Sequence, residues 1–172
     1  MQTIHLLFCK ATRPTVVISQ LYSLNGGKFA AARFNFGDNY IMPQTALPTS
    51  GAPTSIVDYG GLNFPELIPD APVTIINTQI NATDRIIFGS NTRGKQIALF
   101  GYNPTDGTFI GSKYIGFSNS FELASLTPTT DKGLLVLGTT YIAGRFPGSA
   151  FSSYRQMLSG IHSNNAEYPG EG

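Results

Sequence analysis

The carboxylates of this 172-residue chain are its first candidates for catalytic groups, because two facing carboxyl groups are enough to cleave a glycosidic bond. Four of the ten acidic residues sit in or beside apolar stretches: Asp58, Glu66, Asp70 and Glu122. Most of them fall in expected turns or loops, where a solvated carboxylate is ordinary. No Tyr-Glu pair or arginine triad accompanies them. We therefore predict no catalytic residue and expect that the chain is not an enzyme.

The other reactive side chains are too few or too scattered to form a metal or cofactor site. His5 and His162 lie far apart and lack the H-E-x-x-H spacing of zinc enzymes. Cys9 is the only cysteine of the sequence, so neither an intrachain disulfide nor a cysteine-based zinc site can form. No turn glycine is followed by the Lys-Ser/Thr of a phosphate-binding loop. We predict no metal and no cofactor.

The charge composition bears on the partners of the chain. Charged residues make up 12% of the sequence and the formal net charge is +1, which is too small a field to attract a polyanion. We therefore expect no nucleic-acid partner. No apolar run approaches the ~18 residues that a membrane-spanning helix requires, so we expect no membrane span.

A repeat dominates the organisation of the chain. The segment IIFGSNT at residues 86–92 returns as LLVLGTT at residues 134–140, 48 positions later. Repeating units of ~40–50 residues are typical of β-propeller blades. A complete propeller has at least four blades, and this length accommodates about three such units. The sequence therefore predicts antiparallel sheets that form an incomplete ring, a piece of a longer protein, or a part that is completed by another copy.

Alternating apolar residues and turn signals predict the strands of the better-preserved copy. We expect strands at residues 97–102, 109–115, 121–127 and 134–139, joined as one meander of four antiparallel strands. The turns fall at Asn103–Gly107 and Asp131–Gly133, and we expect both Gly107 and Gly133 to take a positive φ. An earlier, less regular copy aligns residues 15–35 with 86–103. Residues 42–54 and 62–72 are interpreted as loops inserted into that copy.

The repeat stops near residue 145, where Pro147 and Gly148 disfavour a strand. Beyond it, Tyr154, Met157, Leu158 and Ile161 follow the spacing of one helical face. The sequence therefore predicts a short helix over 153–161 that covers the strand at 134–140. We divide the chain into a repeat domain, residues 1–147, and a C-terminal tail, residues 148–172.

These patterns resemble the repeats of secreted bacterial β-propeller proteins, including the delta-60 class, best over residues 80–140. The matching residues are Asp106-Gly107, Tyr114, Gly116, Thr129, Asp131, Gly133 and Gly138 to Thr140. The chain departs from the repeat at Lys132-Gly133, where the repeat has Gly-Gly, and at Phe109 or Ile110, where it has Trp. The resemblance implies an extracellular or cell-envelope protein with a binding or structural role, and incomplete blades imply self-association through exposed edges.

The segment Thr129-x-Asp131-x-Gly133 also resembles the Asp-box of sialidase-type propellers, although Val136 stands where that motif has an aromatic residue. In the Asp-box the Asp and Gly stabilise a β-turn and do not act in catalysis. We interpret Asp131 as a residue whose side chain bonds the amides of its own turn.

Together these observations predict an all-β fold, a partial β-propeller or stacked antiparallel four-stranded blades, with a short C-terminal helix. The expected function is a non-enzymatic binding or structural module, and the alternative is a fragment of a glycan-acting propeller enzyme. Tyr40 and Phe64, both on expected insertions, are the candidate ligand-binding residues, since loops carry recognition while a scaffold positions them. The expected partner is a protein or a glycan.

Overall fold

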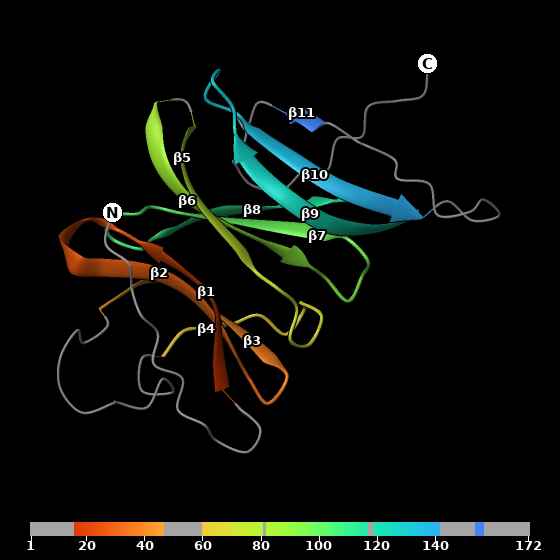
Figure 1. The fold of residues 1–172 in the computed structure, drawn as a ribbon, viewed down its shortest axis with the longest axis horizontal. Helices are drawn as coiled ribbons and strands as arrows, with labels where there is room; N and C mark the ends of the chain where they lie inside the picture. The colour runs from red at the N-terminus through yellow and green to blue at the C-terminus, as the bar shows by residue number, and fades with distance from the viewer. Residues whose placement is uncertain (1–15, 47–59, 81, 117–118, 142–153, 157–172) are drawn as a thin grey trace.

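The computed structural model describes residues 16–46, 60–80, 82–116, 119–141 and 154–156, and these form three antiparallel sheets (Figure 1). The first sheet contains β1 (Val16–Ser23), β2 (Lys28–Asn35), β3 (Asp38–Ala46) and β4 (Leu62–Asn63). The second contains β5 (Thr74–Ile80), β6 (Thr83–Asn91), β7 (Ile97–Tyr102) and β8 (Phe109–Ile115). The third contains β9 (Ser120–Pro128), β10 (Leu134–Tyr141) and β11 (Tyr154–Gln156). One 3-10 turn, η1 (Asn25–Gly27), joins β1 to β2, and the predicted all-β fold is confirmed.

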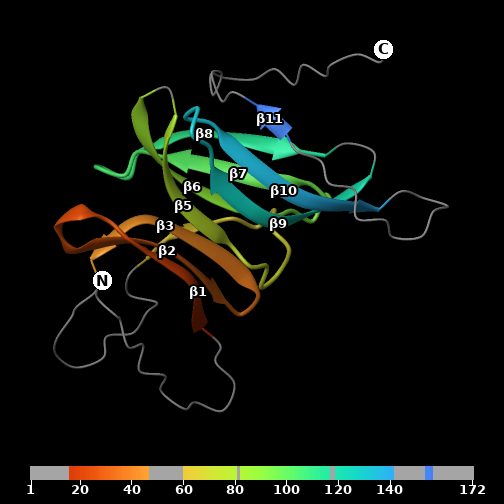
Figure 2. The ribbon, with the colours of Figure 1, turned by 45° about the horizontal axis from the view of Figure 1, so that its top comes forward.

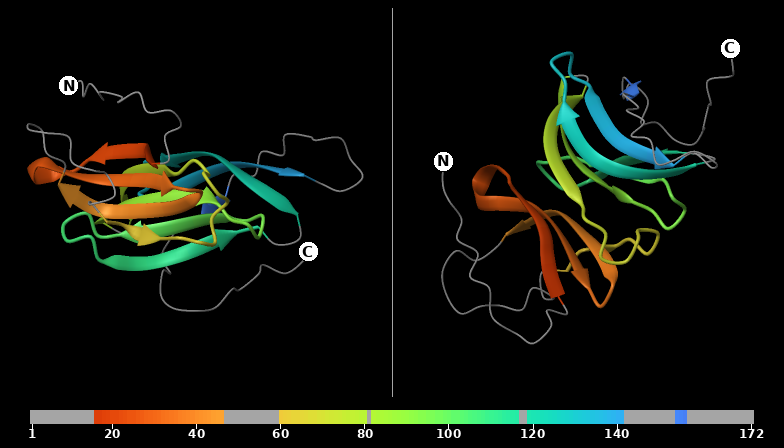
Figure 3. Two further views of the ribbon diagram at one scale, coloured as in Figure 1. Left: turned by 90° about the horizontal axis from the view of Figure 1, so that it is seen from below. Right: turned by 45° about the vertical axis from the view of Figure 1, so that its right-hand side comes forward.

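The second sheet lies between the other two and is covered on both faces (Figures 2 and 3). Every residue of β7 is buried. Because side chains alternate along a strand, Phe100 and Tyr102 join a cluster with the first sheet, while Ile97 and Leu99 join a cluster with the third. A strand with two buried faces has a continuous apolar sequence, as IALFGY does.

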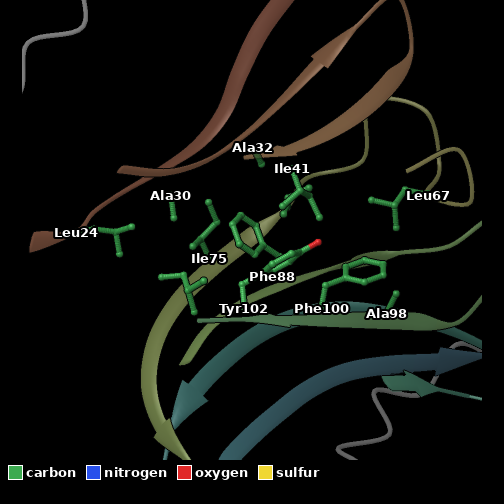
Figure 4. Close-up of a cluster of buried hydrophobic side chains, with 12 residues drawn as sticks. Leu24, Ala30, Ala32, Ile41, Leu67, Ile75, Phe88, Ala98, Phe100 and Tyr102 are labelled. Atoms are coloured by element: carbon green, nitrogen blue, oxygen red, sulfur yellow. The ribbon is translucent and has the colours of Figure 1, made fainter. Parts of the chain in front are cut away.

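Two hydrophobic clusters hold the three layers together. The cluster between the first and second sheets includes Ala30, Ala32, Ile41, Ile75, Ile86, Phe88, Ala98, Phe100 and Tyr102 (Figure 4). Small alanines on β2 face large aromatic rings on the second sheet, which lets the layers approach closely. The cluster between the second and third sheets includes Ile87, Ile97, Leu99, Ile115, Leu126, Leu134 and Val136.

The sheets follow one another by a repeated arrangement. Strand β5 contacts β1 and β2 of the preceding sheet, and β9 contacts β5 and β6 of its preceding sheet. The 48-residue sequence repeat agrees with this arrangement. It relates β6 to β10, and each of these is the second strand of its sheet. The packing therefore matches β1 with β5, whereas the sequence alignment of residues 15–35 with 86–103 matched β1 with β6. That alignment is shifted by one strand.

The third sheet continues the repeat through β11. Leu134, Leu135 and Val136 of β10 pair with Gln156, Arg155 and Tyr154. The residues 48 positions earlier, Ile86 to Phe88 of β6, pair in the same order with Tyr102, Gly101 and Phe100 of β7. Strand β11 thus occupies the place of β7. The expected helix over 153–161 is wrong at residues 154–156, because backbone pairing to β10 makes them a strand, and its other residues lie outside the described part of the chain.

The prediction of one meander over residues 97–139 is also wrong. Strands β8 and β9 belong to different sheets. At the start of β9, the Phe121 amide donates to the carbonyl of Lys95 at 2.9 Å and the Leu123 amide donates to Oδ1 of Asn91 at 2.8 Å. These bonds hold the start of β9 against the end of β6 and the β6–β7 turn. Further along β9, Leu126 packs in the cluster between the second and third sheets.

The predicted turns are confirmed, but one positive φ lies on a neighbouring residue. Between β7 and β8, the Gly107 amide donates to the Asn103 carbonyl at 2.8 Å and Gly107 has φ 74°. Between β9 and β10, the Thr129 amide donates to the Gly133 carbonyl at 3.1 Å. Here Lys132, with φ 61°, takes the left-handed conformation expected of Gly133. The expectation for Gly133 is therefore wrong.

The close approach of the second and third sheets predicts the effect of Gly89→Ala. A Cβ at Gly89 would lie 2.6 Å from Leu126 Cδ1 and 3.0 Å from Leu123 Cδ2, so these leucine side chains would have to shift within the packed layer between the sheets. We expect a loss of about 1–3 kcal/mol in the free energy of unfolding. Gly94→Ala is the matched control, because its Cβ would meet no atom closer than 3.5 Å. Urea unfolding measures both, and equal stabilities of the two variants would contradict the packing.

Because the Tyr102 side chain is buried, we expect the protein to lose stability at alkaline pH. Burial raises the pKa of Tyr102 to about 12, above the ordinary value near 10. The folded state therefore holds this proton more tightly than the unfolded state, and the resulting stability is present below pH 10 and is lost as the pH rises toward 12. We expect Tyr102→Phe to show a smaller fall in thermal midpoint than wild type between pH 9.5 and 11.5. Identical falls would show that Tyr102 does not carry this linkage.

Candidate functional site

A polar pocket lies between the second and third sheets, where the β5–β6 hairpin meets the β9–β10 turn. It is a shallow hollow, widely open to solvent, with a volume of about 380 Å³. The second sheet supplies Asn77, Thr78, Gln79 and Asp84, and the end of β9 with the following turn supplies Pro128, Thr129 and Lys132. We call these seven residues the turn pocket. Nearly all of them carry a hydrogen-bonding group, so the pocket suits a polar ligand.

The second-sheet wall of the turn pocket is fixed by strand pairing. Gln79 on β5 pairs directly with Asp84 on β6. Gln79 Nε2 donates to Asp84 Oδ1 at 2.9 Å, which orients the carboxylate. Thr78, between two exposed pocket residues, is 8% exposed, so the wall is anchored in the sheet.

The other wall is the turn that resembles an Asp-box. The Lys132 amide donates to the Thr129 carbonyl at 3.1 Å, and the Gly133 amide donates to Thr129 Oγ1 at 3.0 Å. The Thr129 hydroxyl also bonds Asp131 Oδ1. The side chains of Thr129 and Asp131 therefore hold the turn together, with Thr129 Oγ1 as the acceptor from the Gly133 amide. A bond from Asp131 to the turn amides stays a prediction. Lys132 is exposed and lines the pocket.

Tyr40 is placed beside a buried arginine. It pairs across β2–β3 with Arg33, whose Cζ lies 4.1 Å from the centroid of the Tyr40 ring. Arg33 is 4% exposed, and its Nε and Nη2 both donate to the carbonyl of Gly60, at 3.0 and 2.7 Å. Arg33 Nη1 is buried and has no hydrogen-bond partner among the described residues. Arg33 lies in the apolar run FAAARF, but arginine is rarely buried, so the sequence does not point to it as a site residue.

Phe64 lies on the other side of the first sheet from Tyr40. It packs against the cluster between the first and second sheets, and its ring centroid lies 4.5 Å from that of Phe100. Tyr40 alternates along β3 with Ile41, a member of that cluster, and so points away from it. The structure therefore does not bring the two predicted ligand-binding residues together on one surface. A role in binding stays a prediction for each.

The candidate carboxylates are distributed over separate elements. Glu66, in the connection from β4 to β5, accepts a hydrogen bond from the Tyr114 hydroxyl at 2.8 Å. Burial, together with this contact, raises the pKa of Tyr114 to about 12. Asp70 lies in the same connection with φ 56°, and Glu122 is on β9. Asp58 lies outside the described residues.

Neither a metal cluster nor a membrane span is found in the described part of the chain. Among those residues, no three side chains of His, Cys, Asp or Glu gather where they could hold a metal ion. Within the same ranges, no helix is long and apolar enough to cross a membrane.

Comparisons with known proteins identify no relative. No family model, no curated protein and no solved structure matches this chain.

The environment of Arg33 predicts that lysine cannot replace it. Arg33→Lys keeps the charge but loses the two donors that bond the Gly60 carbonyl and the planar contact with Tyr40. We expect a loss of about 1–3 kcal/mol in the free energy of unfolding. Arg93→Lys is the control, since its Nε donates to the Pro65 carbonyl at an exposed position. Chemical unfolding of both variants decides the matter, and an Arg33→Lys protein as stable as wild type would exclude a structural role for the guanidinium.

Proposed function

We propose that this chain is a non-enzymatic binding or structural module with the architecture of a partial β-propeller. The observation that carries the proposal is the repeated relation between successive sheets, in which the first strand of each sheet packs across the first two strands of the sheet before it. A propeller blade is a sheet whose strands follow one another in chain order, and successive blades stack face to face in this manner. Strand β11, in the place of β7, supports a third blade.

A binding role is supported by the position of the turn pocket. Repeat scaffolds hold their sheets constant and vary the turns, which is where recognition residues collect. The turn pocket lies where the hairpins of two successive sheets meet, and it departs from the resembled repeat at Lys132. The scaffold therefore positions these polar side chains without any of them being needed in a hydrophobic cluster.

The alternative, a fragment of a glycan-acting enzyme, rests on Asp84. This is the carboxylate that lines the turn pocket, and it is fixed by Gln79. Glycoside hydrolysis uses two carboxyl groups on opposite sides of the scissile bond. The second group would have to come from outside the residues that line the pocket. Binding therefore accounts for the pocket with fewer assumptions than hydrolysis.

Self-association is part of the proposal. Among the described residues, β11 pairs with β10 at three positions, Leu134–Val136, whereas β7 pairs with β6 at six positions in the second sheet. Leu135 and Leu137, partly exposed, alternate with the residues that face the second sheet. Open edges and apolar outer faces of incomplete repeat arrays favour association with further sheets. The proposed setting, the cell envelope or the exterior of a bacterium, rests on the resemblance of the repeats.

One experiment separates binding from hydrolysis. Wild type and Asp84→Asn are incubated with a mixture of neutral and acidic oligosaccharides and with a random peptide library. Mass spectrometry then identifies both retained ligands and cleavage products. We expect retained ligands and an unchanged oligosaccharide mixture. Cleavage by wild type that Asp84→Asn abolishes would contradict the proposed function and establish the enzyme alternative.

A further inference from the structure

We propose that the turn pocket binds a neutral saccharide through adjacent hydroxyl groups, an inference that rests on the binding function proposed above. The charged groups that line the pocket are one carboxylate, Asp84, and one ammonium, Lys132. Their charges cancel, so the pocket gives no net preference for an anion or a cation. The polar lining also disfavours an apolar ligand, which would leave these groups without partners.

The donors and acceptors of the pocket match a vicinal diol. Each sugar hydroxyl can donate one hydrogen bond and accept others. Asp84 accepts only, Lys132 donates only, and the carboxamides of Asn77 and Gln79 do both. Two neighbouring hydroxyls can therefore donate to the carboxylate while accepting from the ammonium and an amide. A peptide backbone, with its donors and acceptors fixed in place, satisfies this set less completely.

The pocket is pre-organised on its second-sheet side. The bond from Gln79 Nε2 fixes Asp84 Oδ1, and a carboxylate has further lone pairs that remain available to a ligand. Asn77, Gln79 and Asp84 all lie on paired strands of one sheet, so the backbone that carries them is fixed before a ligand binds.

Lys132 supplies the positive charge of the pocket. Its side chain is exposed and lines the pocket, where it can donate hydrogen bonds to a ligand. It has φ 61°, a left-handed conformation that four other non-glycine residues of the described ranges also adopt outside the pocket.

Lys95 provides a matched control for the strain. It has φ 63°, is exposed, and lies in the β6–β7 turn outside the turn pocket. Replacing either lysine by glycine removes the same backbone strain, because glycine adopts a positive φ without steric cost. Lys132→Gly removes an ammonium from the pocket, whereas Lys95→Gly removes one from elsewhere. Neither change should lower the thermal midpoint.

The test is a nuclear magnetic resonance titration of the isotope-labelled chain with three neutral trisaccharides, maltotriose, cellotriose and mannotriose. We expect at least one of them to shift the resonances of Asn77, Gln79, Asp84 and Lys132 in a saturable manner. Lys132→Gly should weaken that binding by about tenfold, as expected for one lost charge-assisted hydrogen bond, and Asp84→Asn by a similar factor. Lys95→Gly should bind as wild type does.

The outcomes distinguish this proposal from the function on which it rests. If no trisaccharide perturbs the turn pocket, or if Lys132→Gly binds as tightly as Lys95→Gly, the saccharide proposal is overturned. If a trisaccharide shifts only residues around Tyr40, the module still binds a ligand but the turn pocket is the wrong site. If a trisaccharide binds the turn pocket and is cleaved, the site is supported and the non-enzymatic function is overturned.

Discussion

The rest of this structure depends on one requirement, that the second sheet be covered on both faces. Strand β7 has six consecutive buried residues, which no two-layer arrangement can enclose. Ala98, Phe100 and Tyr102 need the first sheet, and Ile97 and Leu99 need the third. Each layer alone would expose a large apolar surface, so the stack forms as a unit. The cover on each face is another antiparallel meander. Repeating the same meander along the chain is therefore the simplest way to cover the second sheet.

Stacking of this kind separates the residues that stabilise the fold from the residues that are free to vary. The clusters between layers occupy strand interiors, and the turns at the strand ends lie outside them. Hydrogen bonds from connecting segments close the ends of the layers: Asn39 Nδ2 donates to the Ile68 carbonyl at 2.7 Å, and the Ile68 amide donates to the Asn91 carbonyl at 3.0 Å. With the layers fixed in this way, a turn can accept a costly residue such as Lys132. The turn pocket is therefore a product of the scaffold and not a requirement of its core.

Most strands and turns could be predicted from the sequence, because alternation and Asn/Asp-Gly signals are local. The expectation of inserted loops was wrong at residues 42–46, which belong to β3, and at Leu62–Asn63, which form β4, because pairing with neighbouring strands decides their structure. The boundary between the second and third sheets could not be predicted, since alternation is the same whether β9 pairs with β8 or crosses to a new layer. The segment after Ser153 has helical spacing, but pairing of Tyr154–Gln156 with β10, a distant part of the chain, decides its structure. The turn pocket joins residues about fifty positions apart, and Lys132 attracted notice only as a departure from the repeat. The burial of Arg33 likewise depends on packing that no local pattern encodes.

Amide hydrogen exchange followed residue by residue is the most direct measurement of the central claim, the burial of the second sheet between two others. Strands whose amides are both paired and covered on two faces open only with the whole domain. The account predicts that the amides of β6 and β7 exchange most slowly, at a common rate that reports global unfolding, and that those of β2 and β10, the internal strands of the outer sheets, exchange faster. Exchange in β6 and β7 as fast as in β2 or β10 would contradict it, because the second sheet would then have an uncovered face.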